Sequence, residues 1–156
     1  MSHDPNPLST DNCVVWPSSA RRDAFAAWLT QIAPEFGLVA SSLRIASQDA
    51  SFRRYLRIDT DQDTTCVIMD APPLQEDCRP FVQVAGLLRD AGLLAPEVLH
   101  WDQPNGFMLL TDLGSQTMMQ GIDPASPMSN LPRYMQAVDD LILWQLASKP
   151  GVLPNY

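Results

Sequence analysis

Lysine is almost absent from this sequence: nine of the ten basic residues are arginine, and the single lysine is Lys149. Any mechanism that requires a lysine before that position is therefore excluded. Acidic residues outnumber basic ones by 18 to 10, which gives a net charge of −8 at pH 7. A protein with this charge repels polyanions, so we expect neither nucleic acid nor an anionic membrane surface as a partner.

Cysteine, histidine and long apolar runs are scarce as well. The cysteines, Cys13, Cys66 and Cys78, lack the spacing of a metal site, and there are only two histidines. We interpret all three cysteines as reduced thiols in a reducing compartment. The first residues show no signal-peptide pattern, and no apolar run approaches the ~20 residues of a transmembrane helix. The sequence thus predicts a cytoplasmic protein without a membrane partner.

Glycine is rare, with 7 residues, whereas proline is abundant, with 14. The length of 156 residues fits about one domain, and a hydrophobic share of 46% is typical of a globular protein with a packed core. We expect a loose arm over residues 1–17 and a folded unit over 18–114. Residues 115–156 are expected to hold a linker and the start of a further lobe.

The spacing of apolar residues predicts the secondary structure. Apolar positions recur at helical spacing from Phe25 to Ile32, and Pro34 and Gly37 are expected to end that helix. We expect strands over 38–46, 52–58 and 66–69, a helix over 80–91, strands over 97–101 and 107–110, a linker over 121–132 and a helix over 133–147. This order predicts an α+β fold, in which a five-stranded antiparallel sheet carries one packed helix and lies between two further helices.

The segment Asp49–Tyr55 carries the strongest indication of a ligand site. It combines a polar turn and the hydroxyl of Ser51 with two adjacent arginines, Arg53 and Arg54. Backbone N–H groups in such a turn, with guanidinium groups beside them, can hold an anionic group such as phosphate. A solvated hairpin without a ligand is the alternative. Because side chains alternate along a strand, only one of the two arginines can face a cleft, and we favour Arg54.

Four motifs, Asp49–Tyr55, Val67–Pro73, Gly92–Pro96 and Leu109–Gly114, together resemble the aminoglycoside phosphotransferase family. The first two are similar to motifs of the bacterial N-acetylmuramate/N-acetylglucosamine anomeric kinases of cell-wall recycling, and the last two are shared with the wider family. The resemblance covers roughly residues 20–156. It implies the N-terminal, small lobe of a protein-kinase-like fold.

The resemblance also implies a site for ATP, with Mg²⁺ as the metal of the reaction. A loop at 48–53 would cover the nucleotide, and a hinge at Leu109–Leu113 would hold the adenine edge through its backbone. The implied nucleotide contacts are Ser51, Phe52, Arg53, Arg54, Met69, Leu110, Thr111, Asp112 and Leu113. A pure turn role for Asp112 is an equal alternative. Asp70 is expected either near the nucleotide or as a cap of the turn at Pro72.

The sequence departs from the kinase pattern in two places. Protein kinases grip ATP with a lysine on the third strand and a glutamate on the next helix. Both are missing here, so an arginine of the second strand, Arg53, Arg54 or Arg57, would have to meet the phosphates. The family's His-Gly-Asp type catalytic loop and its metal-binding aspartate have no counterpart either. We therefore assign no catalytic residue and no metal ligand.

We expect the nucleotide-binding lobe of an ATP-dependent sugar phosphotransferase. The reaction would transfer the γ-phosphate of ATP to a sugar hydroxyl, the anomeric hydroxyl of an amino sugar, and the sugar would bind through a lobe missing from this chain. The lobe alone is expected to be inactive. The alternative is a non-catalytic, kinase-like binding or interaction module. The motifs leave open which sugar is used, whether the lobe alone binds ATP, and the oligomeric state.

Overall fold

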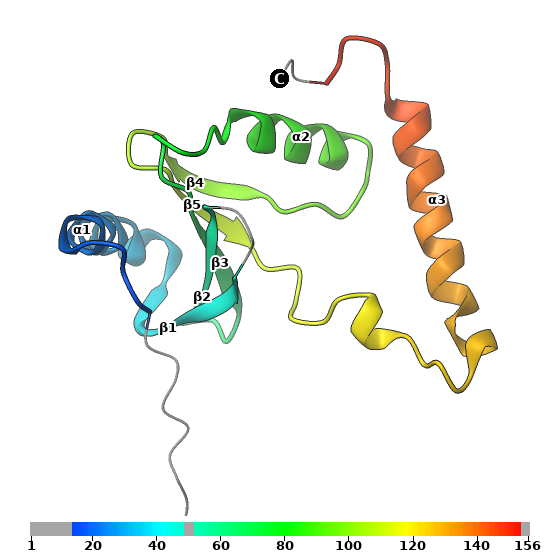
Figure 1. The fold of residues 1–156 in the computed structure, drawn as a ribbon, viewed down its shortest axis with the longest axis horizontal. Coiled ribbons are helices and arrows are strands. Elements are labelled where there is room, and N and C mark those ends of the chain that lie inside the picture. The colour runs from blue at the N-terminus through cyan, green and yellow to red at the C-terminus, as the bar shows by residue number, and fades with distance from the viewer. Residues whose placement is uncertain (1–13, 49–51, 154–156) are drawn as a thin grey trace, which may run out of the picture.

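The computed structural model describes residues 14–48 and 52–153, so Cys13 and Ser51 lie outside the described residues. Within them the helices and strands follow the expected order (Figure 1). They are α1 (Ser19–Phe36), β1 (Leu38–Gln48), β2 (Arg54–Thr60), β3 (Thr65–Asp70), α2 (Arg79–Asp90), β4 (Val98–Asp102), β5 (Phe107–Thr111), the 3₁₀ turns η1 (Met119–Gly121) and η2 (Pro127–Asn130), and α3 (Leu131–Ala147). None of the helices in this part of the chain combines the length and apolar character needed to cross a membrane.

The five strands form one sheet in the order β1-β2-β3-β5-β4, and all neighbours are antiparallel. This confirms the predicted α+β fold with a five-stranded antiparallel sheet. In the β2–β3 ladder, Arg54 lies opposite Asp70 and Leu56 lies opposite Ile68. Residues opposite each other on neighbouring strands share a face of the sheet, so Arg54 and Asp70 share the face of the Leu56–Ile68 pair.

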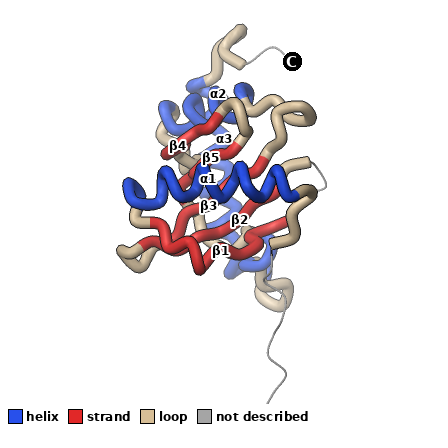
Figure 2. Tube along the Cα trace, turned by 90° about the vertical axis from the view of Figure 1, so that its left-hand side faces the viewer, coloured by secondary structure: helices blue, strands red, loops and turns tan. Residues whose placement is uncertain are grey.

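Helix α1 covers that face of the sheet, and Figure 2 shows it lying across the strands. Its buried side chains pack against buried residues of the edge strand β1 and of the inner strands β2, β3 and β5. The helix contributes Phe25, Trp28, Leu29 and Ile32, and the strands contribute Leu38, Leu56, Ile58, Cys66, Ile68, Phe107 and Leu109. Burying one large apolar side chain contributes about 1.5–3 kcal/mol, so this cluster is the main source of folding free energy.

Both ends of α1 agree with the local sequence. The Ser18 side chain accepts a hydrogen bond from the backbone N–H of Arg21 at 3.1 Å, which caps the first turn. Pro34 lies inside the last turn and does not end the helix. Proline lacks a backbone N–H, so it removes a single hydrogen bond, and here that loss falls in the last turn. The helix ends at Gly37, whose φ of +62° is in the left-handed region that favours glycine.

Helix α2 covers part of the opposite face. The second buried cluster consists of Met69, Ala71, Cys78, Met108 and Leu110, and Phe81 and Val82 of α2 pack against it. Because alternate residues of β3 and β5 enter the two clusters, the sheet is buried on both faces over its central strands. Phe52, the first residue of the strand expected over 52–58, is 62% exposed, since the strand begins only at Arg54.

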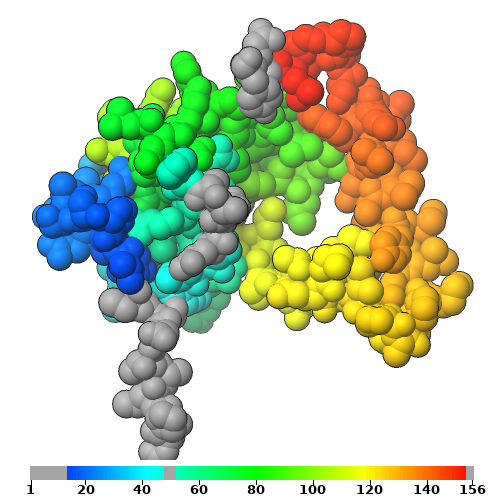
Figure 3. All heavy atoms as spheres, viewed as in Figure 1, coloured from blue at the N-terminus to red at the C-terminus, as the bar shows by residue number. Residues whose placement is uncertain are grey.

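Helix α3 stands apart from the sheet, with an open space between them (Figures 1 and 3). The helical spacing that predicts this helix comes from Tyr134, Val138, Leu141, Ile142 and Leu146. All five side chains are exposed, and the helix buries none of its residues against the described part of the chain.

Candidate functional site

The strand β2 sends alternate side chains to the two faces of the sheet. Leu56 and Ile58 belong to the core under α1, whereas Tyr55 packs against the cluster under α2. Arg57 lies on the Tyr55 face and lines a hollow there together with that tyrosine. The α2 face is therefore the one on which β2 can present polar side chains to a ligand.

A hollow of about 420 Å³ opens on this face, between the β1–β2 hairpin and the segment that follows β5. We call it the hinge hollow. It is lined by Ala46, Ser47, Tyr55, Arg57, Val67, Phe81, Pro96, Leu110, Thr111, Leu113, Gly114, Ser115 and Thr117. Three of the expected contacts, Leu110, Thr111 and Leu113, thus come together in one place. Its floor is apolar, and charge enters only at its edge through Arg57.

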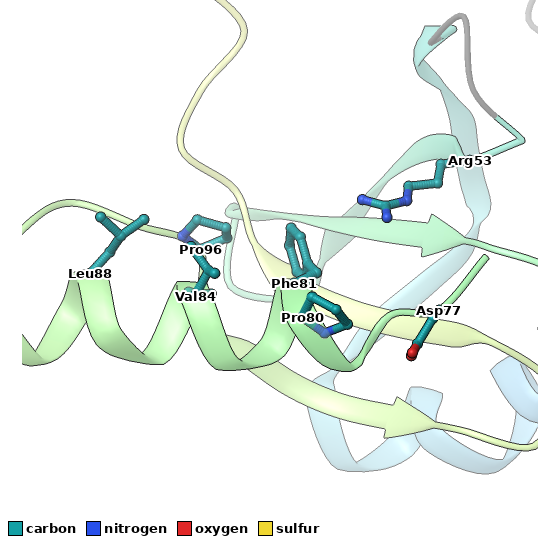
Figure 4. Close-up of a pocket in the computed structure, with 8 residues that line it drawn as sticks. Arg53, Asp77, Pro80, Phe81, Val84, Leu88 and Pro96 are labelled. Atoms are coloured by element: carbon teal, nitrogen blue, oxygen red, sulfur yellow. The ribbon is translucent and has the colours of Figure 1, made fainter. Parts of the chain in front are cut away.

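A second hollow of about 620 Å³ runs along α2 (Figure 4). Its wall is mostly apolar, and Phe81 and Pro96 line both hollows, so the two lie side by side. Arg53 reaches toward α2 from the residue just before β2, and Asp77 lies just before the helix. Hydrogen bonds from the side chain and backbone of Arg79 lower the pKa of Asp77 to about 2, so it is charged at neutral pH.

Two of the three candidate arginines, Arg53 and Arg57, thus lie on the face with the hollows, and Arg53 is the one that lines the second hollow. Its Nε donates a hydrogen bond to Glu76 at 3.0 Å, and both side chains are partly buried. Burial lowers the pKa of Arg53, but hydrogen bonding and attraction to Glu76, with a further contribution from Tyr55, outweigh it and raise the pKa. The guanidinium group stays charged at every physiological pH.

Arg54, favoured from the sequence as the arginine that faces the cleft, lies on the opposite face. Its Nε and Nη2 both donate to Asp70, its Nη1 donates to the carbonyl of Val15 at 2.6 Å, and its guanidinium group lies 4.7 Å from the Trp16 ring centre. Arg54 is in phase with the core residues Leu56 and Ile58, which is why it faces α1.

Asp70 has neither of the roles expected for it. Its carboxylate is buried and accepts from Arg54 on one oxygen and from Arg21 of α1 on the other, with Arg21 Nε at 3.0 Å. Arg21, which lies 49 residues away, was not among the expected site residues. The available signal was the phase of β3, in which Asp70 follows the α1-facing residues Cys66 and Ile68.

Two further expected contacts are placed differently. Met69 is fully buried in the cluster under α2 and lines neither hollow. The carboxylate of Asp112 is not available to a ligand, because Arg57, Thr65 and the backbone N–H of Gly114 all donate hydrogen bonds to it. Burial raises the pKa of Asp112, but these hydrogen bonds outweigh it and hold the pKa below its ordinary value.

The described residues offer no site for a metal ion. No group of three or more His, Cys, Asp or Glu side chains suited to a metal is present among them. Cys66 and Cys78 are free and buried, and burial raises the pKa of both thiols, which makes them poor nucleophiles at neutral pH. We therefore derive no step through Mg²⁺ from this chain.

Comparison with known proteins agrees with this geometry. A family model described as the phosphotransferase enzyme family matches residues 42–142, which include the whole sheet except the start of β1. The chain belongs to this family. The resemblance inferred from the four motifs is thereby confirmed, and the sheet with α2 on one face is the small lobe of the kinase-like fold.

The similar curated proteins are all kinases of one kind. The N-acetylmuramate/N-acetylglucosamine kinase of Pseudomonas aeruginosa is 44% identical over 144 residues, which is 88% of this chain and 41% of that protein. The protein of the same name from Pseudomonas putida is 44% identical over 75% of this chain and 33% of its own length. A third, from Neisseria meningitidis serogroup B, is 34% identical over 83% and 37%. The chain thus spans less than half the length of the relatives that it matches.

Proposed function

We propose that this chain supplies the nucleotide-binding lobe of an ATP-dependent sugar kinase. Family membership supports a phosphotransferase, and the hinge hollow is the observation that carries the nucleotide site. The relatives are named for N-acetylmuramate and N-acetylglucosamine, so we propose an amino sugar as acceptor and its anomeric hydroxyl as the phosphorylated group. Since ATP is a cytoplasmic donor, we place the protein in the cytoplasm.

Each part of the site has a distinct task in this proposal. The apolar floor with Val67 and Leu110 suits the face of a purine, and the backbone around Leu113 suits its hydrogen-bonding edge. Arg53 lies toward the neighbouring hollow and would meet the phosphates there. Glu76 already binds Arg53, so a phosphate has to share or displace this carboxylate.

The proposal is tested by titrating the ¹⁵N-labelled chain with ATP to millimolar concentration and following backbone amide shifts. We expect shifts around Val67, Leu110 and Leu113. The variant Arg53→Met should bind ATP about tenfold more weakly and adenosine unchanged, because it loses a charged phosphate contact but keeps most of the side-chain volume. Arg22→Met, which removes an exposed arginine paired with Asp23 on α1, is the matched control. An unmodified chain that does not respond to ATP would refute the proposal.

A second expectation concerns activity. Because the sequence contains no His-Gly-Asp type segment, we expect the chain of 156 residues to release no ADP above background when amino sugar and ATP are supplied. Release of ADP that depends on the sugar and disappears in Arg53→Met would contradict this expectation, since the lobe would then carry catalytic groups of its own.

The alternative, a non-catalytic binding or interaction module, is favoured by one observation. Helix α3 exposes several large apolar side chains, among them Tyr134, Leu141 and Leu146, and exposed patches of this kind mark contact surfaces. Light scattering of the purified chain, together with the ATP titration, distinguishes the two hypotheses. A stable, soluble homodimer that fails to bind ATP would support the module, whereas a monomer that binds ATP would support the kinase lobe.

A further inference from the structure

The carboxylate of Asp112 accepts four hydrogen bonds from the protein itself. Arg57 donates from Nε at 2.5 Å to one oxygen and from Nη2 at 3.0 Å to the other. The Thr65 hydroxyl donates at 2.6 Å and the backbone N–H of Gly114 at 2.8 Å. The Asp112 side chain is only 6% exposed. Four donors fill the lone pairs of a carboxylate, so this group holds the protein chain and leaves no position for a sugar or ribose hydroxyl.

These contacts fix the backbone directly after β5. The N–H of Gly114 is held by Asp112, and its carbonyl accepts from Arg57 Nη2 at 3.1 Å. Gly114 has a φ of +102°, a conformation that other residues rarely adopt. Residues 112–114 are thus tied sideways to β2 and β3, and we call Arg57, Asp112, Thr65 and Gly114 the hinge clamp.

The other end of the hinge is anchored as well. The backbone N–H of Thr111 donates to the Glu97 carbonyl at 3.0 Å, and the Thr111 hydroxyl accepts from the Glu97 N–H at 2.9 Å. Leu113 lies between the two anchors, is 49% exposed and lines the hinge hollow. No hydrogen bond from another described residue reaches the Leu113 backbone. Its peptide groups are therefore held in place at the edge of the hollow while remaining open to a ligand.

We propose that the hinge clamp makes the backbone around Leu113 selective for the adenine base, with Arg57 and Asp112 as positioning residues. This inference rests on the proposed nucleotide site and adds to it the group that sets base preference. A backbone N–H and C=O can read a purine edge only when their spacing is fixed, because a hydrogen bond weakens steeply with misalignment. The bidentate Arg57–Asp112 pair supplies that rigidity, and a lysine could not replace its planar fork.

The depressed pKa of Asp112 agrees with a carboxylate that stays ionised and bound throughout the physiological range. It also gives a direct signal of the clamp. The Gly114 amide, bonded to this carboxylate, should show a proton chemical shift that titrates only at acidic pH, and Asp112→Asn should abolish that titration.

The test compares the affinities of ATP, GTP and inorganic tripolyphosphate for the 156-residue chain by NMR titration. Asp112→Asn and Arg57→Lys should each weaken ATP about fivefold, the loss of roughly one backbone hydrogen bond, and should reduce the preference for ATP over GTP. Tripolyphosphate affinity should stay unchanged. Asp59→Asn, which breaks the less buried Arg44–Asp59 pair, also made by a residue of β2, is the matched control. Thr65→Val, which removes a single hydroxyl from the clamp, serves if the charged variants do not fold.

The outcomes separate the two proposals. If the unmodified chain prefers ATP and folded clamp variants keep that preference, the clamp inference is wrong while the nucleotide site stands. If clamp variants weaken ATP and tripolyphosphate equally, the clamp supports the fold only, and the inference is again refuted. If the unmodified chain binds no nucleotide, the proposed function and the clamp's role in recognition both fail.

Discussion

Replacing Asp70 by asparagine should lower the free energy of unfolding by about 3 kcal/mol. The buried carboxylate is 1% exposed and lies between Arg21 and Arg54, each of which donates two hydrogen bonds to one of its oxygens. Asparagine has nearly the same shape but carries no charge, and its NH₂ group would face N–H donors. Two partly buried guanidinium groups would then share one neutral acceptor.

The size of this loss in unfolding free energy depends on how far water can solvate the two guanidinium groups that lose their charged partner. Removing one partner of a fully buried ion pair costs about 3–5 kcal/mol. The side chains of Arg21 and Arg54 are 14% and 26% exposed, so water reaches both guanidinium groups in part. Each arginine also keeps a backbone carbonyl, of Asn105 and Val15 respectively, and an aromatic ring. These remaining contacts place the cost at the lower end of that range.

The assay is urea unfolding of the chain at neutral pH, with the slope m compared between variants. Asp23→Asn, which breaks an exposed pair with Arg22, is the control and should change stability by less than about 0.5 kcal/mol. The triple variant with Arg21→Met, Asp70→Leu and Arg54→Met should recover most of the loss, because an apolar replacement of a buried ionic cluster leaves no charge unpaired. A loss below about 1 kcal/mol for Asp70→Asn at unchanged m would refute the reasoning.

Three further predictions follow. Because the pKa of Asp112 is depressed in the folded state, its contribution to stability should be complete above about pH 4 and be lost as pH falls through the folded pKa; acid unfolding of Asp112→Asn should lack this component. Gly37→Ala should cost about 1 kcal/mol in urea unfolding, because φ is +62° and the added Cβ meets only the Asp61 side chain, which can turn away. Gly86→Ala in α2, where a Cβ meets nothing within 4 Å, should stabilise by about 0.5–1 kcal/mol in the same assay; equal effects of the two substitutions would contradict both explanations.

The order of elements could be predicted because each helix and strand has its own apolar period. The pairing of β5 with β3, which makes β4 an edge strand, depends on contacts far apart in the sequence and was not predicted. The face of Arg54 was open to prediction, since it is in phase with Leu56 and Ile58, yet we expected Arg54 on the cleft face. The Asp70–Arg21 contact was beyond reach, because nothing local fixes how α1 lies across the sheet.

The scarcity of lysine has a physical counterpart in this arrangement. The three arginines just before and within β2 each pair with a different carboxylate: Arg53 with Glu76, Arg54 with Asp70 and Arg57 with Asp112. Arg54 and Arg57 each use two nitrogens of the planar guanidinium group. A lysine ammonium is a compact point charge and cannot reproduce these paired contacts at partly buried sites. Each arginine thus has its own role. Arg54 holds the Asp70 carboxylate under α1 on one face of the sheet, and Arg57 holds the hinge on the other face. Arg53 places a positive charge at the hollow beside α2.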